Sequence, residues 1–213
     1  GISSKPFNNL NVSFQVGDKD KNVVENRHKI MQALNLRYCV SAKQINGNHV
    51  LVIDEKVKLK LFANKKTTVE VKNMDALVTN QKQIGLMIQV ADCQAILFFD
   101  PAKQVLGMAH AGWKGLKQDI SGKVIETMKE DFDCNPENIL VGIGPSLNFL
   151  NNEFSDPAQE LGPAFIPYIM KGNKVDLWEF SRQQLISHGI QEKKIENARL
   201  YSNLLKDIPE LIL

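Results

Sequence analysis

Two side chains that can do chemistry, Cys93 and His110, stand at the outer ends of two apolar runs. The runs cover residues 94–99 and 104–109, and a polar segment that contains a proline separates them. This pattern is typical of a β-hairpin. With residues 100–103 as the loop, the strand register places Cys93 directly across from His110. Opposed residues have Cβ atoms about 4.5–5.5 Å apart, so the pattern predicts that this thiol and this imidazole meet.

A thiol beside an imidazole can share a metal ion or act as a nucleophile and its base. Taken singly, a buried cysteine is usually a small hydrophobe, and a histidine at a strand end is usually a satisfied polar residue. The residues that follow, Gly112-Trp113-Lys114-Gly115, indicate the start of a helix. Free N–H groups at a helix start favour an anion, and Lys114 adds a positive charge. The pattern therefore predicts a phosphate site next to Cys93 and His110, although many helix starts bind nothing.

Several further elements must position these residues. Apolar residues that recur every four positions predict one helix from Leu116 to Phe132. Residues 74–79 and 84–90 read as a second hairpin that leads into Cys93, and residues 56–66 read as an edge strand and turn. At least eight short strands and three or four helices favour an α+β fold with antiparallel or mixed sheets.

Composition excludes several classes of function. The chain has 213 residues, 43% of them hydrophobic, and a net charge of +2. This charge is too small to argue for nucleic acid, and no apolar run is long enough to span a membrane. The three cysteines are an odd number and do not make a disulfide framework. They favour a reduced, cytoplasmic setting. The oligomeric state is left open.

Three stretches carry a resemblance to a known family. They are Ala91-Asp92-Cys93, then Ile96-Leu97-Phe98, and then Ala-His-Ala-Gly-Trp-Lys-Gly at residues 109–115. Together they resemble the YfiH/YlmD family, formerly called multicopper polyphenol oxidase or laccase-domain proteins, which includes the peptidoglycan editing factor and FAMIN. The resemblance extends from residue 1 to about Trp178. It implies a sandwich of two mixed or antiparallel sheets flanked by helices (αββα), in one domain over residues 1–213 that lacks the family's N-terminal strand and C-terminal arginine motif.

The resemblance also implies a function. It is a zinc-dependent purine nucleoside phosphorylase, which cleaves adenosine or inosine with phosphate and has adenosine deamination as a side activity. The implied zinc ligands are Cys93 and His110, and Asn46 stands where the family has its third ligand, a histidine. An amide is a poor zinc ligand. The candidates for substrate or phosphate contacts are Arg27, Gln44, Asp92 and Lys114.

Other functions remain open. A catalytically degenerate relative would bind a nucleoside or a partner protein without turnover. A metal-free hydrolase, including one that edits cell-wall precursors, would use Cys93 as nucleophile and His110 as base. Copper oxidation is the weakest alternative because it needs many histidines. The chain has four, and they are widely scattered: His28, His49, His110 and His188.

Overall fold

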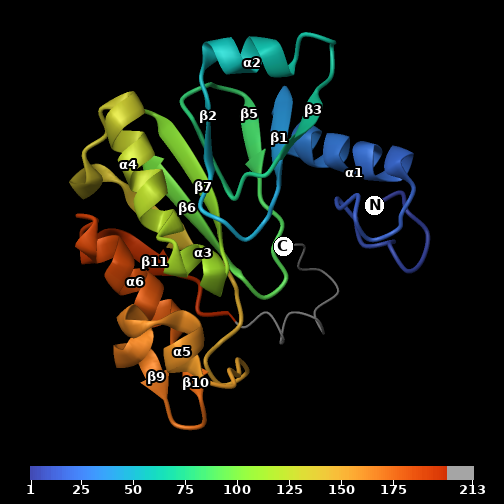
Figure 1. Ribbon diagram of the computed structural model, residues 1–213. Helices are drawn as coiled ribbons and strands as arrows, with labels where there is room; N and C mark the ends of the chain where they lie inside the picture. Colours follow the sequence, from blue (N-terminus) through green and yellow to red (C-terminus); the bar gives the residue numbers. More distant parts are fainter. Residues whose placement is uncertain (201–213) are drawn as a thin grey trace.

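The computed structural model describes residues 1–200 and shows an α+β protein built in four layers (Figure 1). A six-stranded mixed sheet has the strand order β11-β8-β6-β7-β4-β2, and a three-stranded parallel sheet has the order β3-β1-β5. Helices α4 and α6 cover one face of the large sheet, and α1 lies on the far side of the small sheet. The expected arrangement of two sheets flanked by helices is confirmed, with the small sheet entirely parallel.

The strands are short, and most belong to the large sheet. Its members are β2 (Val50–Ile53), β4 (Ala76–Thr79), β6 (Gln94–Asp100), β7 (Val105–Ala111), β8 (Leu140–Ile143) and β11 (Ile195–Asn197). The small sheet contains β1 (Tyr38–Lys43), β3 (Thr68–Lys72) and β5 (Ile84–Met87). A separate antiparallel pair consists of β9 (Ile169–Met170) and β10 (Lys174–Val175).

The helices connect and cover these strands. The α-helices are α1 (Asp20–Ala33), α2 (Glu55–Leu61), α3 (Trp113–Lys117), α4 (Ile120–Phe132), α5 (Pro157–Leu161) and α6 (Leu177–Ser187). Residues 1–200 also contain three 3-10 helices: η1 (Pro136–Asn138), η2 (Pro163–Tyr168) and η3 (Glu192–Lys194). No helix in residues 1–200 is long and apolar enough to cross a membrane.

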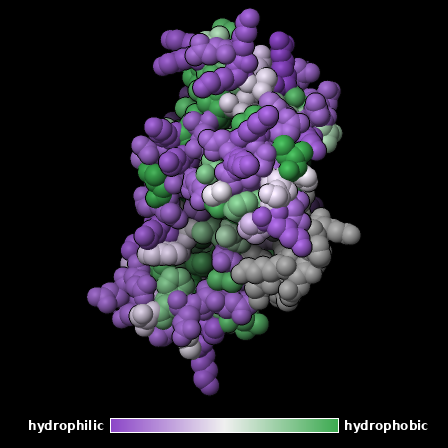
Figure 2. Space-filling model, turned by 90° about the vertical axis from the view of Figure 1, so that its right-hand side faces the viewer, coloured by the Kyte–Doolittle hydropathy of each residue, from purple (hydrophilic) through white to green (hydrophobic). Residues whose placement is uncertain are grey.

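Alternation along the strands creates two hydrophobic cores. On β6 and β7, Ile96, Phe98 and Ala109 face the helices and pack in the core that includes α4. Leu106 and Met108 face the other way and pack in the core between the two sheets. On the face in Figure 2, hydrophilic side chains predominate, and hydrophobic ones gather mainly in a recess in its lower half.

The first predicted hairpin is confirmed as β6 and β7, but its predicted register is wrong. His110 pairs with Ala95, not with Cys93, because the loop is residues 101–104 rather than 100–103. Asp100 remains in its strand, where its Oδ1 accepts the N–H groups of Ala102 (2.8 Å) and Lys103 (3.0 Å). The loop then ends at Gln104, whose φ is +55°. The Asp100 side chain thus caps the turn and moves the loop by one residue, which changes the partner of every residue in β6 and β7.

The second predicted hairpin is wrong. Strand β4 lies in the large sheet, antiparallel to β7 and parallel to β2, whereas β5 lies in the small sheet, parallel to β1. The polar segment between β4 and β5 therefore crosses from one sheet to the other. Both strands are apolar because they contribute to the core between the sheets. An apolar run predicts a buried strand but does not say which strand it pairs with.

Two further predictions, one of an edge strand and turn and one of a helix, also need correction. The predicted edge strand at residues 56–66 contains helix α2, because Asp54 caps it by accepting the Val57 N–H at 2.7 Å. The single helix predicted from Leu116 to Phe132 is two helices, α3 and α4, which meet at Asp119 with a φ of +58°. The expectation about a C-terminal arginine motif concerns the chain after Leu200 and lies outside the described residues.

Candidate functional site

Three side chains converge on the space above Gly112. A Cβ atom built on this glycine would lie 2.9 Å from Cys93 Sγ, 3.5 Å from Asn46 Oδ1 and 3.7 Å from His110 Nε2. The structure thus brings together Cys93, His110 and Asn46 even though the predicted strand pair is wrong. In the observed register, Cys93 lies one step beyond the Gln94–Ala111 pair, next to Gly112. The absence of a side chain at Gly112 leaves room for the three polar atoms.

The Cys93 thiol is half-buried and lies just before β6. Burial raises its pKa, and the negative charge of Asp92 raises it further. The thiol is therefore protonated at neutral pH until a base or a metal ion removes the proton. Among the three free cysteines, Cys39 and Cys134 are buried, and Cys93 is the most exposed.

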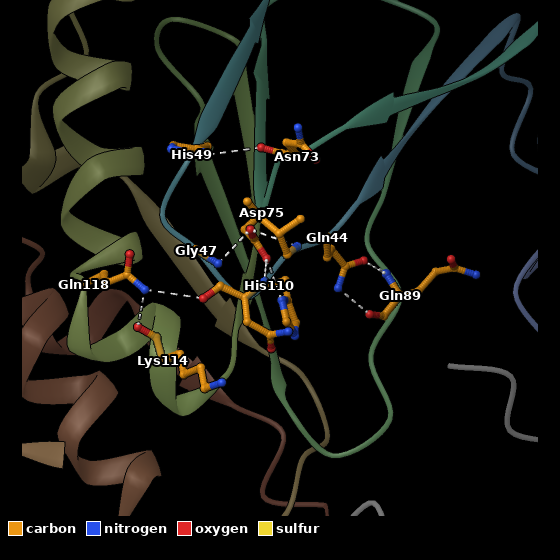
Figure 3. Close-up of polar contacts among 11 residues, drawn as sticks. Gln44, Gly47, His49, Asn73, Asp75, Gln89, His110, Lys114 and Gln118 are labelled. Atoms are coloured by element: carbon orange, nitrogen blue, oxygen red, sulfur yellow. Dashed lines mark hydrogen bonds and ion pairs between the residues drawn. The ribbon is translucent and has the colours of Figure 1, made fainter. Parts of the chain in front are cut away.

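His110 is the second-last residue of β7, and its ring contacts Asp75 on one side (Figure 3) and faces the space above Gly112 on the other. Its Nδ1 lies 3.0 Å from Asp75 Oδ1, and both side chains are buried. Sequence reasoning did not single out Asp75 as a site residue. An available signal was its position, since a carboxylate stands directly before the buried strand β4.

Asn46 occupies the turn between β1 and β2. Its φ is +59°, a left-handed conformation that asparagine tolerates better than most residues. His49, three residues later, is exposed, and its Nδ1 lies 3.2 Å from the Asn73 carbonyl oxygen (Figure 3). His49 therefore does not replace the missing imidazole at position 46.

Gln44 and Lys114 belong to the segments that carry Asn46 and Gly112, and they differ in their bonding. The Gln44 amide donates to the Gln89 carbonyl at 2.7 Å and accepts the Gln89 N–H at 3.0 Å, so it ties β1 to the loop that carries Cys93 (Figure 3). Lys114 is exposed, and its Nζ lies 5.3 Å from the centre of the Trp113 ring. It belongs to α3, which has only five residues. Because this helix is so short, the predicted anion site rests on the Lys114 side chain rather than on the helix start.

Arg27 is not part of this cluster. It is 1% exposed, its Nε donates to the Val12 carbonyl at 2.9 Å, and its Nη1 donates to Ser41 Oγ at 3.0 Å. Burial lowers the pKa of its guanidinium. Arg27 lines a separate cavity of about 540 Å³ between α1 and β3, together with residues such as Phe14 and Glu70. Asp92 is exposed, and its carbonyl accepts the Leu147 N–H at 2.9 Å.

The donor set fits a metal ion only in part. Cys93 and His110 offer a thiol and an imidazole nitrogen, which are strong zinc ligands, whereas Asn46 offers an amide oxygen. Residues 1–200 contain no group of three or more His, Cys, Asp or Glu side chains that could hold a metal. The four histidines contact four different partners: Thr67, Asn73, Asp75 and Asp119. This scatter does not provide the histidine cluster that copper oxidation needs.

Comparison with known proteins identifies the class to which this fold and site belong. A family model described as multi-copper polyphenol oxidoreductase laccase matches residues 1–204, and the chain belongs to this family. The structure of YlmD from Geobacillus stearothermophilus superimposes with a TM-score of 0.81 at 25% identity, over 97% of this chain and 80% of that one. The structure of Bacillus licheniformis YfiH gives a TM-score of 0.76 at 26% identity.

Curated relatives in the family carry the name purine nucleoside phosphorylase. YlmD of Bacillus subtilis is 37% identical over 150 residues, which cover 70% of this chain and 53% of YlmD. YfiH of Escherichia coli is 30% identical over 200 residues, which cover 90% of this chain and 76% of YfiH. The chain therefore spans about half of B. subtilis YlmD and three quarters of YfiH. The YfiH/YlmD resemblance is confirmed.

Proposed function

We propose that this chain is a purine nucleoside phosphorylase whose reaction takes place at the space above Gly112. The convergence of Cys93, His110 and Asn46 on that space is the observation that carries the proposal. The names of the relatives at 30–37% identity support the reaction class. The substrates would be a purine nucleoside, adenosine or inosine, and inorganic phosphate.

In this reaction a phosphate oxygen bonds to the anomeric carbon of the ribose, and the bond from that carbon to the purine nitrogen breaks. The purine leaves with the electron pair and takes up a proton. Lys114, two residues after Gly112 and exposed, would balance the charge of the phosphate. Cys93 and His110 would hold zinc, with Asn46 as a weak third donor. Bound zinc would supply a Lewis acid that polarises the substrate.

The test is to incubate the protein with adenosine or inosine, phosphate and zinc, and to detect the free base and ribose-1-phosphate by mass spectrometry. Formation of inosine from adenosine in the same samples would report the proposed deaminase side activity. Cys93→Ala should abolish product formation. The matched control is Cys134→Ala, because Cys134 is buried at the opposite end of the β6–β7 hairpin. Wild type without product, or Cys93→Ala with full activity, would refute the phosphorylase proposal.

Asn46 supports a second candidate. With an amide in place of a third strong ligand, the chain would act without metal, either as a thiol hydrolase through Cys93 and His110 or as a non-catalytic binder of a nucleoside or partner protein. Zinc content after dialysis separates these candidates. Stoichiometric zinc in the wild type that is lost in Cys93→Ala supports the metal enzyme. A wild-type protein that contains no zinc and still hydrolyses a substrate in the presence of a chelator supports the hydrolase.

A further inference from the structure

The Asp75 carboxylate connects two parts of the site, which we call its arms: the His110 side chain is the first arm, and the turn at residues 45–47 is the second. It is fully buried, and both of its oxygens are used twice. Oδ1 accepts the Asn46 N–H at 2.9 Å and contacts His110 Nδ1 at 3.0 Å. Oδ2 accepts the N–H groups of Ile45 at 3.2 Å and Gly47 at 2.9 Å. Asp75 therefore links the end of β7 to the turn after β1, two segments far apart in the sequence (Figure 3).

The geometry points to Asp75 as a positioning residue that fixes the proton of His110 and the conformation of Asn46 together. A carboxylate only accepts hydrogen bonds, so His110 Nδ1 must carry the proton in this contact. The lone pair then lies on Nε2, the nitrogen that faces the shared space above Gly112. A carboxylate behind a histidine commonly fixes the ring in this way for ligation or proton transfer.

The second arm is the turn at residues 45–47. Three successive backbone N–H groups point at the one carboxylate, and this holds Asn46 in its left-handed conformation. The same backbone places Asn46 Oδ1 3.5 Å from the Cβ position of Gly112. If the turn were released, the amide oxygen would lose its fixed place beside Cys93. Asp75 itself contacts His110 and the turn, so it acts through them.

An asparagine cannot replace this carboxylate, because a side-chain amide has one oxygen and one NH2 group. With the NH2 group toward His110, it would donate to Nδ1, move the ring proton to Nε2 and leave the Asn46 N–H without an acceptor. With the NH2 group on the other side, it would leave the N–H groups of Ile45 and Gly47 without an acceptor. Either orientation breaks at least one arm. The inference rests on the proposed function only in that the two arms serve the reaction proposed for this site.

The experiment compares Asp75→Asn with Asp100→Asn. Asp100 is an equally buried carboxylate at the other end of the same hairpin, where its Oδ1 accepts two turn N–H groups. Asp75→Asn removes an acceptor of backbone N–H groups, whereas Asp100→Asn can keep its amide oxygen on the two turn N–H groups, so the melting temperature should fall more in Asp75→Asn. Only Asp75→Asn should change the site. The ring 15N shifts of His110 are recorded at about pH 8, above the ordinary histidine pKa, with and without a chelator.

Wild type and Asp100→Asn should show a protonated Nδ1 and an unprotonated Nε2. In Asp75→Asn, an amide that turns its NH2 group to His110 should shift the ring proton to Nε2 or leave it shared between the two nitrogens. An amide that turns its oxygen to His110 should instead alter the backbone amide shifts of residues 45–47. The zinc affinity of this variant, measured by competition with a chelating dye, should fall about 10- to 100-fold. Asp100→Asn should leave both readouts unchanged.

A wild-type spectrum with the proton on Nε2 overturns the inference, and it does so even if Asp75→Asn fails to fold. An unchanged zinc affinity together with unchanged shifts in a folded Asp75→Asn protein also overturns it. The outcome does not depend on turnover. A protonated Nδ1 in a protein that makes no ribose-1-phosphate leaves the role of Asp75 standing and removes the phosphorylase proposal. Formation of ribose-1-phosphate by a protein whose His110 carries its proton on Nε2 removes the role of Asp75 and leaves the phosphorylase proposal standing.

Discussion

An aspartate and a cysteine lie at each end of the β6–β7 hairpin, but their surroundings differ. At each end a fully buried aspartate accepts backbone N–H groups of a turn, and a cysteine lies nearby. At one end Asp75 also holds His110, and Cys93 borders the space above Gly112. At the other end Cys134 is 3% exposed, and burial together with Asp100 raises the pKa of its thiol to about 12.

The comparison shows that residue type alone does not make a site. Cys134 lies in the core against a carboxylate, and burial together with that negative charge outweighs the opposite effect of Lys103, so its thiolate is disfavoured. Cys93 shares its space with an imidazole nitrogen and an amide oxygen, and a glycine keeps that space free. The difference between the ends is thus the histidine and the missing side chain at position 112.

The largest expected effect comes from filling that space. Gly112→Ala places a methyl group 2.9 Å from Cys93 Sγ, closer than side chains normally approach. The backbone of Gly112 has φ −74° and ψ 167°, which alanine adopts without strain. We expect kcat/KM for phosphorolysis to fall about 100-fold, as for a misplaced catalytic group, with the fold retained. The control is Gly142→Ala in β8, where an added Cβ meets nothing within 4 Å. Equal kinetics for the two variants would contradict the role of the space above Gly112.

A smaller effect of opposite sign is expected for Asn46→His. The turn backbone already directs side chain 46 toward Cys93 and His110, so an imidazole there supplies a third strong donor. Zinc affinity should rise at least tenfold, which corresponds to about 1.4 kcal/mol. The matched control is Asn48→His in the same turn, whose side chain donates to the Gln118 carbonyl instead. An unchanged affinity in Asn46→His would show that side chain 46 does not reach the site.

A third effect, seen only at alkaline pH, concerns stability at the structural end of the hairpin. The pKa of Cys134 is raised to about 12 in the folded chain, so the folded state keeps a proton that the unfolded state loses at lower pH. This contribution is complete below the unfolded thiol pKa of about 8.5 and disappears as the pH rises toward 12. The free energy of unfolding, measured with urea, should therefore fall less steeply above pH 9 in Cys134→Ala than in wild type. Parallel pH profiles for the two proteins would refute this account of Cys134.

The apolar runs predicted both strands of the hairpin, since their alternation is a local property of the sequence. The register could not be predicted from these runs, because it depends on the Asp100 carboxylate, which caps the turn by accepting two of its N–H groups. The helix at residues 55–61 was missed for a related reason, the cap at Asp54. Caps and left-handed residues, such as Gln104 and Asp119, are individually weak signals, yet they decide where elements end.

The proximity of three candidate residues was predicted better than the strand pairing. Cys93, His110 and Asn46 were selected by residue type and family pattern, and they converge although Cys93 does not pair with His110. Asp75 was missed because its role depends on two segments that meet only in the folded chain. Arg27 was selected by pattern alone, and its contacts with Val12 and Ser41 place it elsewhere.

The central claim is that Cys93 and His110 form one ligand-binding site and that Cys134 does not belong to it. A Co²⁺ titration followed by optical absorption tests this directly, because a cobalt–thiolate bond gives a charge-transfer band that other donors do not. The account predicts a saturable band in wild type and in Cys134→Ala, and no such band in Cys93→Ala or His110→Ala. A band that survives in Cys93→Ala, or no band in wild type at saturating Co²⁺, would contradict it.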